Sequence, residues 1–257
     1  MKKHIDLAKL VAALDRELDP QKMKDYSHNG LQVTRRDAKI TKVCLGVDAS
    51  LPLYEEALRR GAQLVVCHHG LSWNDSLARV TGYNFDQLEF LIQNKLALYA
   101  SHLPLDAHPR LGNNAQIAKA LKLKNTKPFL KYNGSDIGVR GELEKPVSLD
   151  AFAALVKKIT GRDDLTVFPF GKPRVKTVAI ASGGAAHEIN QPIDAGIDAY
   201  LSGEPALDAY NRAEQCKMNA VFAGHYATEV FGVRALADYI TKKFGVEAEF
   251  VDFKIPF

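Results

Sequence analysis

The sequence is poor in cysteine and contains no cysteine motif. Its three cysteines, Cys44, Cys67 and Cys216, lie far apart and form no CxxC pair. An odd count at such spacing argues against a disulfide framework. Each cysteine lies in or near an apolar run, so we expect all three to be buried free thiols.

Long apolar runs are also missing. No stretch approaches the roughly 18 uninterrupted apolar residues of a membrane-spanning helix. The first residues lack the continuous apolar segment and small-residue cleavage site of a signal peptide. Instead, Leu7, Leu10, Val11, Leu14 and Leu18 follow helical spacing. We therefore expect a cytoplasmic protein without a membrane association.

Charge of one sign does not dominate the chain. Lys and Arg number 34 and Asp and Glu number 30, which gives a net charge of +4 spread along the sequence. Nucleic-acid binding usually needs a clustered basic face, so this small excess does not point to it. The hydrophobic share of 46% and the charged share of 25% are ordinary for a soluble globular protein and exclude intrinsic disorder.

The first half of the sequence alternates short apolar strands with helical patterns. Strands are predicted at 43–47, 64–67 and 96–100, and helices at 51–60 and 86–94. This alternation predicts an α/β protein with a largely parallel sheet. The strands lack alternating polar residues, which indicates burial on both faces.

The middle of the chain has a different pattern. Short alternating segments occur at 136–143 and 165–168, with a helical segment at 149–159 between them. Ser148 precedes that helix as a predicted N-cap. The pattern is α+β and indicates a second domain.

The α/β pattern then returns as an internal duplication. Counted from Gly61 and Gly196, Glu204 falls opposite His69. The first copy ends in His102-xxx-Asp106 and the second in His225-xxx-Glu229. Any two βα units look alike, but a polar pair that recurs at equal offset favours duplication. The matching segments are 43–47 with 178–182, 62–69 with 197–204, and 97–102 with 220–225.

Five residues at these predicted strand ends suit metal binding. Neighbours such as His68 and His69 point to opposite faces of an extended chain. They can serve one site only where the strand ends or where two metals lie close together. Imidazole with carboxylate suits Zn²⁺, Fe, Mn²⁺, Co²⁺ or Ni²⁺ better than Mg²⁺ or Ca²⁺. Such a set can hold two metals about 3.5–4 Å apart and deprotonate a bridging water. The candidate ligands are His68, His69, Asp106, His225 and Glu229.

Other polar residues have weaker claims. His102 is either a ligand or a group that supports the ligands or faces the substrate. Glu204 is its weaker counterpart in the second copy. Residues 182–184 (Ser-Gly-Gly) form either a plain tight turn or an anion-binding helix start. Residues 29–33 resemble a turn entering a strand and carry no obvious chemistry. Surface or local capping roles are expected for His4, His28, His187 and His108, the last of which could border the site.

Five motifs in register resemble a known family. They are residues 29–33 (NGLQV), 67–71 (CHHGL), 101–106 (SHLPLD), 202–204 (SGE) and 224–229 (GHYATE). The chain resembles the Nif-three-like dinuclear metal-binding proteins, the GTP cyclohydrolase 1 type 2 homologues, in their short form without an inserted middle domain. The resemblance implies two interlinked, related α/β domains, which we place at 1–127 plus 226–257 and at 128–225.

The resemblance also implies a site, an assembly and an activity. The site would hold two divalent transition-metal ions per subunit on His68, His69, Asp106, His225 and Glu229. The assembly would be a homohexamer, a trimer of dimers with the metal sites facing its interior. The activity would be opening of the guanine imidazole ring of GTP by metal-bound hydroxide, with His102 as the catalytic residue that shuttles protons.

Two other functions remain open at this point. The chain could be a non-catalytic metal-binding scaffold or regulator, which predicts metal without turnover. It could also be a ring-shaped nucleic-acid-associated protein, which predicts strongly salt-dependent binding. The small net charge permits the second alternative without requiring it.

Overall fold

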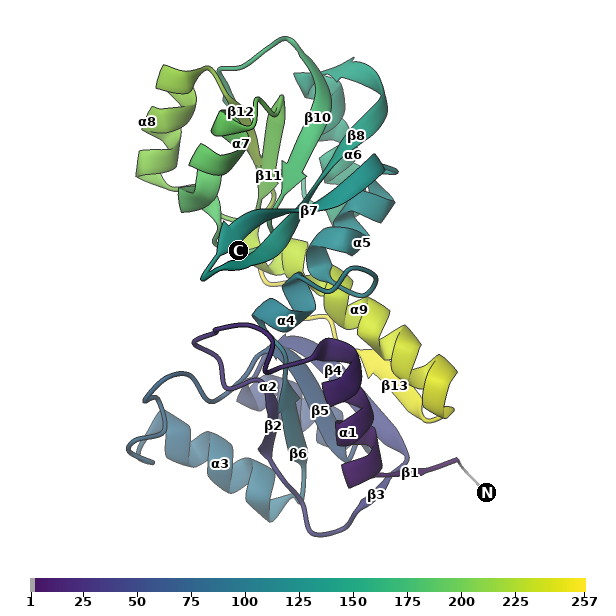
Figure 1. Ribbon diagram of the computed structural model, residues 1–257. Coiled ribbons are helices and arrows are strands. Elements are labelled where there is room, and N and C mark those ends of the chain that lie inside the picture. The colour runs from purple at the N-terminus through teal and green to yellow at the C-terminus, as the bar shows by residue number, and fades with distance from the viewer. Residues whose placement is uncertain (1–2) are drawn as a thin grey trace. The chain divides into compact units, whose positions relative to one another are not determined.

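The computed structural model describes residues 3–257, which form two compact units (Figure 1). Unit 1 comprises the described residues up to Leu105 together with Val233–Phe253, and unit 2 comprises Asp106–Gly232 with Lys254–Phe257. The sequence-based division at 127/128 and 225/226 thus differs from these compact units. Residues 113–120 belong to unit 2 because Ile117, Ala118 and Leu121 pack into its core. None of the helices within 3–257 has the length and apolar character to cross a membrane.

Unit 1 is a five-stranded sheet with helices on both faces. The strand order is β13-β4-β5-β6-β2, in which only β2 is antiparallel to its neighbour. Its elements are β1 (Ile5–Asp6), α1 (Leu7–Leu18), β2 (Gly30–Val33), β3 (Lys39–Ile40), β4 (Lys42–Asp48), α2 (Leu51–Arg59), β5 (Leu64–His69), α3 (Tyr83–Gln93), β6 (Ala97–Ala100), α4 (Leu103–Asp106, whose last residue is in unit 2) and β13 (Glu247–Phe250).

The central strands of unit 1 are buried on both faces, as their unbroken apolar runs predict. On one face, Cys44, Val65 and Leu98 pack against Tyr54 of α2 and Leu91 of α3. On the other face, α1 covers the sheet, and the Tyr99 hydroxyl donates to Asp15 Oδ1 at 2.9 Å. Burying the apolar stripes of these helices contributes most of the stabilisation.

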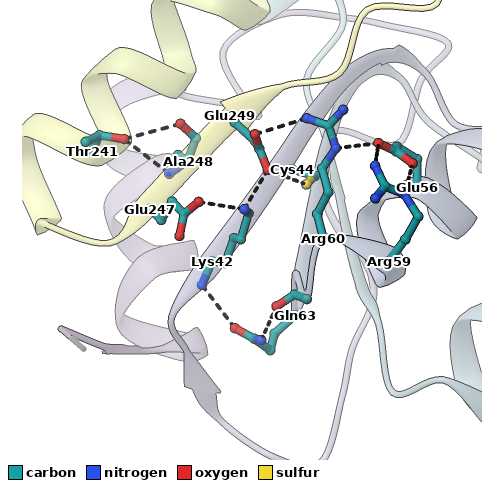
Figure 2. Close-up of polar contacts among 11 residues, drawn as sticks. Lys42, Cys44, Glu56, Arg59, Arg60, Gln63, Thr241, Glu247, Ala248 and Glu249 are labelled. Carbon is teal, nitrogen blue, oxygen red and sulfur yellow. Dashed lines mark hydrogen bonds and ion pairs between the residues drawn. The ribbon is translucent and has the colours of Figure 1, made fainter. Parts of the chain in front are cut away.

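An ion-pair network fastens the edge strand β13 to β4 (Figure 2). Lys42 Nζ lies 2.5 Å from Glu247 Oε1 and 2.6 Å from Glu249 Oε1, and Arg60 lies 3.0 Å from Glu249 Oε2. Hydrogen bonds from the Lys42 ammonium lower the pKa of Glu249. Burial, and then the negative charge of Glu249, raises the pKa of the neighbouring Cys44 thiol to about 11.

Unit 2 is built on a six-stranded mixed sheet of order β7-β8-β10-β11-β12-β9. Its core contains Phe152 and Val156 of α6 together with Val178, Leu201 and Val221 of the central strands. Its elements are α5 (Asn113–Ala120), β7 (Lys124–Tyr132), β8 (Ser135–Ser148), α6 (Leu149–Thr160), β9 (Thr166–Pro169), β10 (Arg174–Ile180), η1 (Ala186–Ile189), α7 (Asn190–Asp194), β11 (Ala199–Ser202), α8 (Leu207–Cys216), β12 (Asn219–Phe222) and the first part of α9 (His225–Phe244, which continues into unit 1).

The strand order confirms the predicted duplication. In unit 1, β4, β5 and β6 are parallel and β2 lies antiparallel outside β6. In unit 2, β10, β11 and β12 are parallel and β9 lies antiparallel outside β12. The units differ on the opposite side of the shared strands, where the parallel edge strand β13 borders β4 but the antiparallel strand β8, itself followed by β7, borders β10.

Two local expectations need correction. The helix start considered for residues 182–184 is followed only by a short 3₁₀ turn, η1, and the single turn α7. So short an element offers no anion-binding helix terminus, and residues 182–184 form the plain turn. Cys44 and Cys67 are buried as expected, but Cys216 is exposed because it ends α8 on its outer face.

Candidate metal-binding residues in each unit

In unit 1, the two adjacent histidines close strand β5. The strand ends at His69, so the chain turns immediately after the pair, as a shared role requires. His68 is fully buried and its Nδ1 donates to the Ser101 carbonyl oxygen at 2.9 Å. His69 Nδ1 lies 2.8 Å from Asp48 Oδ1. The two ring centroids are 4.6 Å apart.

His102 follows β6 and is held by a carboxylate that the sequence analysis did not identify. Its Nδ1 lies 2.9 Å from Asp25 Oδ1, and the Asp25 side chain is only 2% exposed. Asp25 Oδ2 also accepts from Leu103 N at 3.0 Å and from Asn29 Nδ2 at 2.9 Å. Burial raises the pKa of Asp25, but the hydrogen bond and positive charge of His102, with further hydrogen bonds, outweigh it and lower the pKa to about 2.

These histidines form a group that could hold a metal ion. One ring nitrogen from each of His68, His69 and His102 lies within 4.8 Å of the other two. Metal-binding histidines commonly use one ring nitrogen for an oxygen that fixes the ring and the other for the metal. His68 and His69 have this arrangement through their Nδ1 atoms.

In unit 2, polar side chains fix the buried carboxylate of Asp106. Asn113 Nδ2 donates to Asp106 Oδ1 at 2.9 Å, and Ser182 Oγ donates to the same oxygen at 3.0 Å. Asn113 is itself fully buried and its Oδ1 accepts from Gly232 N at 2.6 Å. The carboxylate therefore has a defined orientation.

The remaining carboxylate and imidazole of unit 2 lie on the first turns of α9. His225 begins the helix, and Glu229 lies one turn later on the same face. His225 Nε2 lies 3.1 Å from Glu229 Oε1, while its Nδ1 lies 2.8 Å from Glu204 Oε1. Ligand oxygens of Glu229 and Asp106 lie within 4.8 Å of each other.

A glycine makes room for this cluster. Gly183 has φ +66°, a conformation that L side chains rarely adopt, and a Cβ on it would lie 2.2 Å from Glu229 Oε1. The backbone can therefore approach the carboxylate only without a side chain. The structure gives the Ser-Gly-Gly turn this role in place of anion binding.

Each unit thus brings together three of the predicted residues. Unit 1 groups His68, His69 and His102, and unit 2 groups Asp106, His225 and Glu229. The other histidines are local: His28 and His187 are exposed, with bonds to Ser72 and Asp208, His4 is exposed, and buried His108 accepts from Arg110 N and Leu111 N through Nδ1.

Sequence reasoning missed the residues that orient these groups. Asp25, Asp48, Asn113 and Ser182 lie in separate segments whose proximity appears only in the fold. A signal existed for residues 29–33, which were read as carrying no chemistry. Gln32 Oε1 accepts from Leu71 N at 2.7 Å and so holds the loop that follows the two histidines.

Comparison with known proteins identifies the family of this chain. The DUF34/NIF3 (NGG1p interacting factor 3) family model matches residues 5–256. The chain belongs to this family. The GTP cyclohydrolase 1 type 2 homolog of Deinococcus radiodurans is 43% identical over 229 residues, which cover 89% of this chain and 86% of the relative. The homolog of Archaeoglobus fulgidus is 38% identical over 248 residues, which cover 96% and 98% of the two chains.

Solved structures share the whole fold of this DUF34/NIF3 protein. The structural-genomics protein ybgI, described as of unknown function, superposes with a TM-score of 0.92 at 32% identity, and the match covers 98% of this chain and 100% of that one. A crystal structure of a protein from Thermus thermophilus has a TM-score of 0.88 at 32% identity, with coverage of 98% and 100%. These matches confirm the resemblance that the five motifs indicate.

Proposed function

We propose that this DUF34/NIF3 protein is a dinuclear metal-dependent hydrolase. The proposed ligands are His68, His69, Asp106, His225 and Glu229. The observation that carries the proposal is the buried, pre-oriented donor set of each unit: imidazoles fixed through Nδ1 in unit 1, and a fixed carboxylate pair with an imidazole in unit 2.

The donor set fits divalent transition metals. Imidazole nitrogen and carboxylate oxygen together match Zn²⁺, Fe²⁺, Mn²⁺, Co²⁺ or Ni²⁺. Gly183 provides a cradle that a Cβ would fill, so the backbone can lie close beside the buried Glu229 carboxylate. When bound, two such ions would lower the pKa of a water molecule and polarise the group that it attacks.

The proposed reaction is hydrolytic opening of a purine ring in a nucleotide such as GTP, which the names of the relatives suggest. In this reaction, His102 would transfer protons. Asp25 engages His102 Nδ1, so Nε2 is the ring nitrogen that would carry out the transfer. Because the pKa of Asp25 is about 2, its carboxylate stays ionised at neutral pH and stabilises the protonated imidazole during transfer.

The test is to count metal per chain and to assay GTP with and without chelator. We expect His68→Ala and Glu229→Gln to lose metal and abolish product formation. His187→Ala is the control, because His187 is exposed and pairs with Asp208 away from the candidate ligands. Product formation that survives His68→Ala at wild-type rate would overturn the proposal.

Asp25→Asn separates positioning from metal binding. Loss of the ionised partner should reduce kcat by about 10–100-fold while metal content stays at the wild-type level. The pH profile of kcat should also shift, because His102 loses its charged partner. An Asp25→Asn variant with unchanged kcat would remove His102 from the proposed proton transfer.

A homohexamer, a trimer of dimers, is the proposed assembly. Light scattering on the purified chain would test it directly against the mass of the 28.3 kDa subunit. A stable monomer or dimer at working concentration would contradict this proposal without affecting the metal ligands.

A further inference from the structure

A cavity in unit 2 lies outside the candidate metal residues. It has a volume of about 640 Å³ and is bordered by α5, the loop before it, and the β7–β8 hairpin. All of these elements belong to unit 2 (Figure 1). Cavities of about 300–1,000 Å³ are the usual size for binding small molecules.

The cavity is strongly basic although the chain as a whole is nearly balanced in charge. None of the described residues that line it is acidic. Within residues 3–257, the four lysines of its rim make no ion pair with a carboxylate. Glu142, which faces Lys124 across the strands, lies 3.6 Å from Lys176. The cationic lining residues are Arg110, Lys119, Lys122, Lys124 and Lys127.

The backbone places these cations at one rim. Helix α5 ends at Ala120, and after the C-cap residue Leu121 comes Lys122 in a left-handed conformation with φ 57°, which turns the chain sharply. Leu121 and Leu123 are anchored in the core on either side of that turn. Lys119, Lys122 and Lys124 therefore border the cavity from a fixed turn.

A buried histidine shapes the other side of the rim. His108 Nδ1 accepts from Arg110 N at 3.2 Å and from Leu111 N at 3.0 Å, so it caps the turn that presents Arg110. The lining also includes small or apolar residues such as Ala107, Ala115 and Val139. A flat apolar ring could rest there while anionic groups meet the cations.

We propose that this cavity binds a phosphate-rich small molecule of the size of a nucleoside triphosphate. Ammonium groups bind phosphate oxygens as point charges, and several around one cavity suit a chain of phosphates. The volume of about 640 Å³ matches a small ligand better than a nucleic-acid strand. The site is independent of the proposed metal chemistry, because none of its lining residues is a candidate ligand.

Calorimetric titration with chelator present tests the site without metal. The probes are GTP, inorganic triphosphate and a single-stranded oligonucleotide. We expect saturable binding of GTP or triphosphate that weakens about tenfold in Lys119→Gln/Lys122→Gln, because two ion pairs are lost. Tighter binding of GTP identifies a nucleotide as the ligand, and equal binding identifies a polyphosphate chain.

A matched pair of lysines provides the control. Lys157 and Lys158 lie exposed in the last turn of α6, outside the cavity, so Lys157→Gln/Lys158→Gln removes the same charge. This variant should bind as the wild type does. Ala115→Trp should block binding by filling the cavity without changing charge. Circular dichroism checks that each variant is folded.

Three outcomes would overturn the proposal. One is the absence of saturable binding by GTP and triphosphate. Another is equal weakening in the two double-lysine variants, which would indicate diffuse attraction. The third is tighter binding of the oligonucleotide that Lys119→Gln/Lys122→Gln abolishes, which would make the cavity part of a nucleic-acid surface. Binding that persists in His68→Ala supports independence from the metal site.

Discussion

The two units share one strand order but carry different polar groups at the ends of their strands. In unit 1, three histidines gather after β5 and β6, and their oxygen partners come from Asp25, Asp48 and a backbone carbonyl. In unit 2, the cluster consists mainly of carboxylates, which neutral groups such as Asn113 and Ser182 orient. A duplicated scaffold has thus kept its strand-end positions and diversified the chemistry placed there.

One pair of equivalent positions, residues 48 and 183, illustrates how the two units differ. Residue 48 ends β4 in unit 1, and residue 183 has the matching position after β10 in unit 2, yet one is an aspartate and the other a glycine. Asp48 reaches out to fix His69, whereas Gly183 leaves space for Glu229. At this position, unit 1 therefore has a side chain that orients its histidine, and unit 2 has none, which leaves room for its carboxylate.

The largest effect on stability is expected from a side chain at Gly183. Gly183→Ala adds a Cβ 2.2 Å from Glu229 Oε1 on a left-handed backbone. Strain and overpacking together should lower the free energy of unfolding by about 3 kcal/mol. Urea unfolding followed by fluorescence measures the loss.

Gly196→Ala is the control for backbone conformation alone. Gly196 has φ +64°, but nothing lies within 4 Å of its added Cβ. Gly196→Ala should lower the unfolding free energy by about 1 kcal/mol, through backbone strain alone. Asp48→Ala should lower it by less than about 1 kcal/mol, because half-exposed polar contacts contribute little. Equal costs for the two glycine variants would show that proximity to Glu229 does not constrain residue 183.

A smaller loss is expected from Asn113→Ala in unit 2. Asn113 is fully buried and bridges Asp106 to the Gly232 amide, so truncation leaves both without this partner. We expect a loss of about 2 kcal/mol in unfolding free energy. Gln32→Ala, which frees the loop after the histidines in partly exposed surroundings, should cost less. If Gln32→Ala lowered the unfolding free energy more than Asn113→Ala does, the hydrogen bonds around the unit 1 histidines would matter more for stability than those around Asp106 in unit 2.

The sequence predicted the scaffold well because its signals are local. Unbroken apolar runs identified β4, β5 and β6, and equal offsets identified their copies in unit 2. The same signals placed His68, His69 and His102 after the apolar runs of β5 and β6, where the structure groups them. These features depend on residues that are close together in the sequence, and on the rule that the carboxyl ends of parallel strands lie at the same edge of a sheet.

The orienting residues could not be predicted in the same way. Asp25 lies 77 positions from His102, and Ser182 lies 76 from Asp106. No period or spacing in the chain links such pairs. The boundary between the units could not be predicted from the sequence either. Helix α5 follows the first copy directly in the chain, yet its Ile117 is buried in the core of unit 2.

The sheet edges offer a pH-dependent contrast between the units. In unit 1, hydrogen bonds from Lys42 lower the pKa of Glu249. A lowered pKa in the folded state means that the stabilisation is present above the ordinary glutamate pKa and is lost as pH falls through the lowered value. We expect Glu249→Gln to cost about 0.5–1 kcal/mol at pH 7 and almost nothing at about pH 2.

Glu142→Gln in unit 2 is the matched control for this edge. Its carboxylate lies 3.6 Å from Lys176 and is 40% exposed, so its ion pair is weaker. Unfolding at several pH values should show little pH-dependent difference from the wild type. A pH-independent cost of Glu249→Gln would mean that packing, and not charge, holds β13 against β4.

The smallest effect is expected from labelling the cysteine thiols, because this measurement leaves the folded protein unchanged. Unit 1 contains Cys44 and Cys67, both buried, and burial raises the pKa of each thiol. Unit 2 contains the exposed Cys216.

Thiolate is the reactive form, so a disulfide reagent at pH 8 should modify one thiol per native chain and three after unfolding. Cys216→Ser should abolish the native reaction without changing stability. If Cys44 reacted in the native protein, β13 would have to separate from β4 for a time. The pairing of this edge strand in unit 1 would then be less stable than expected.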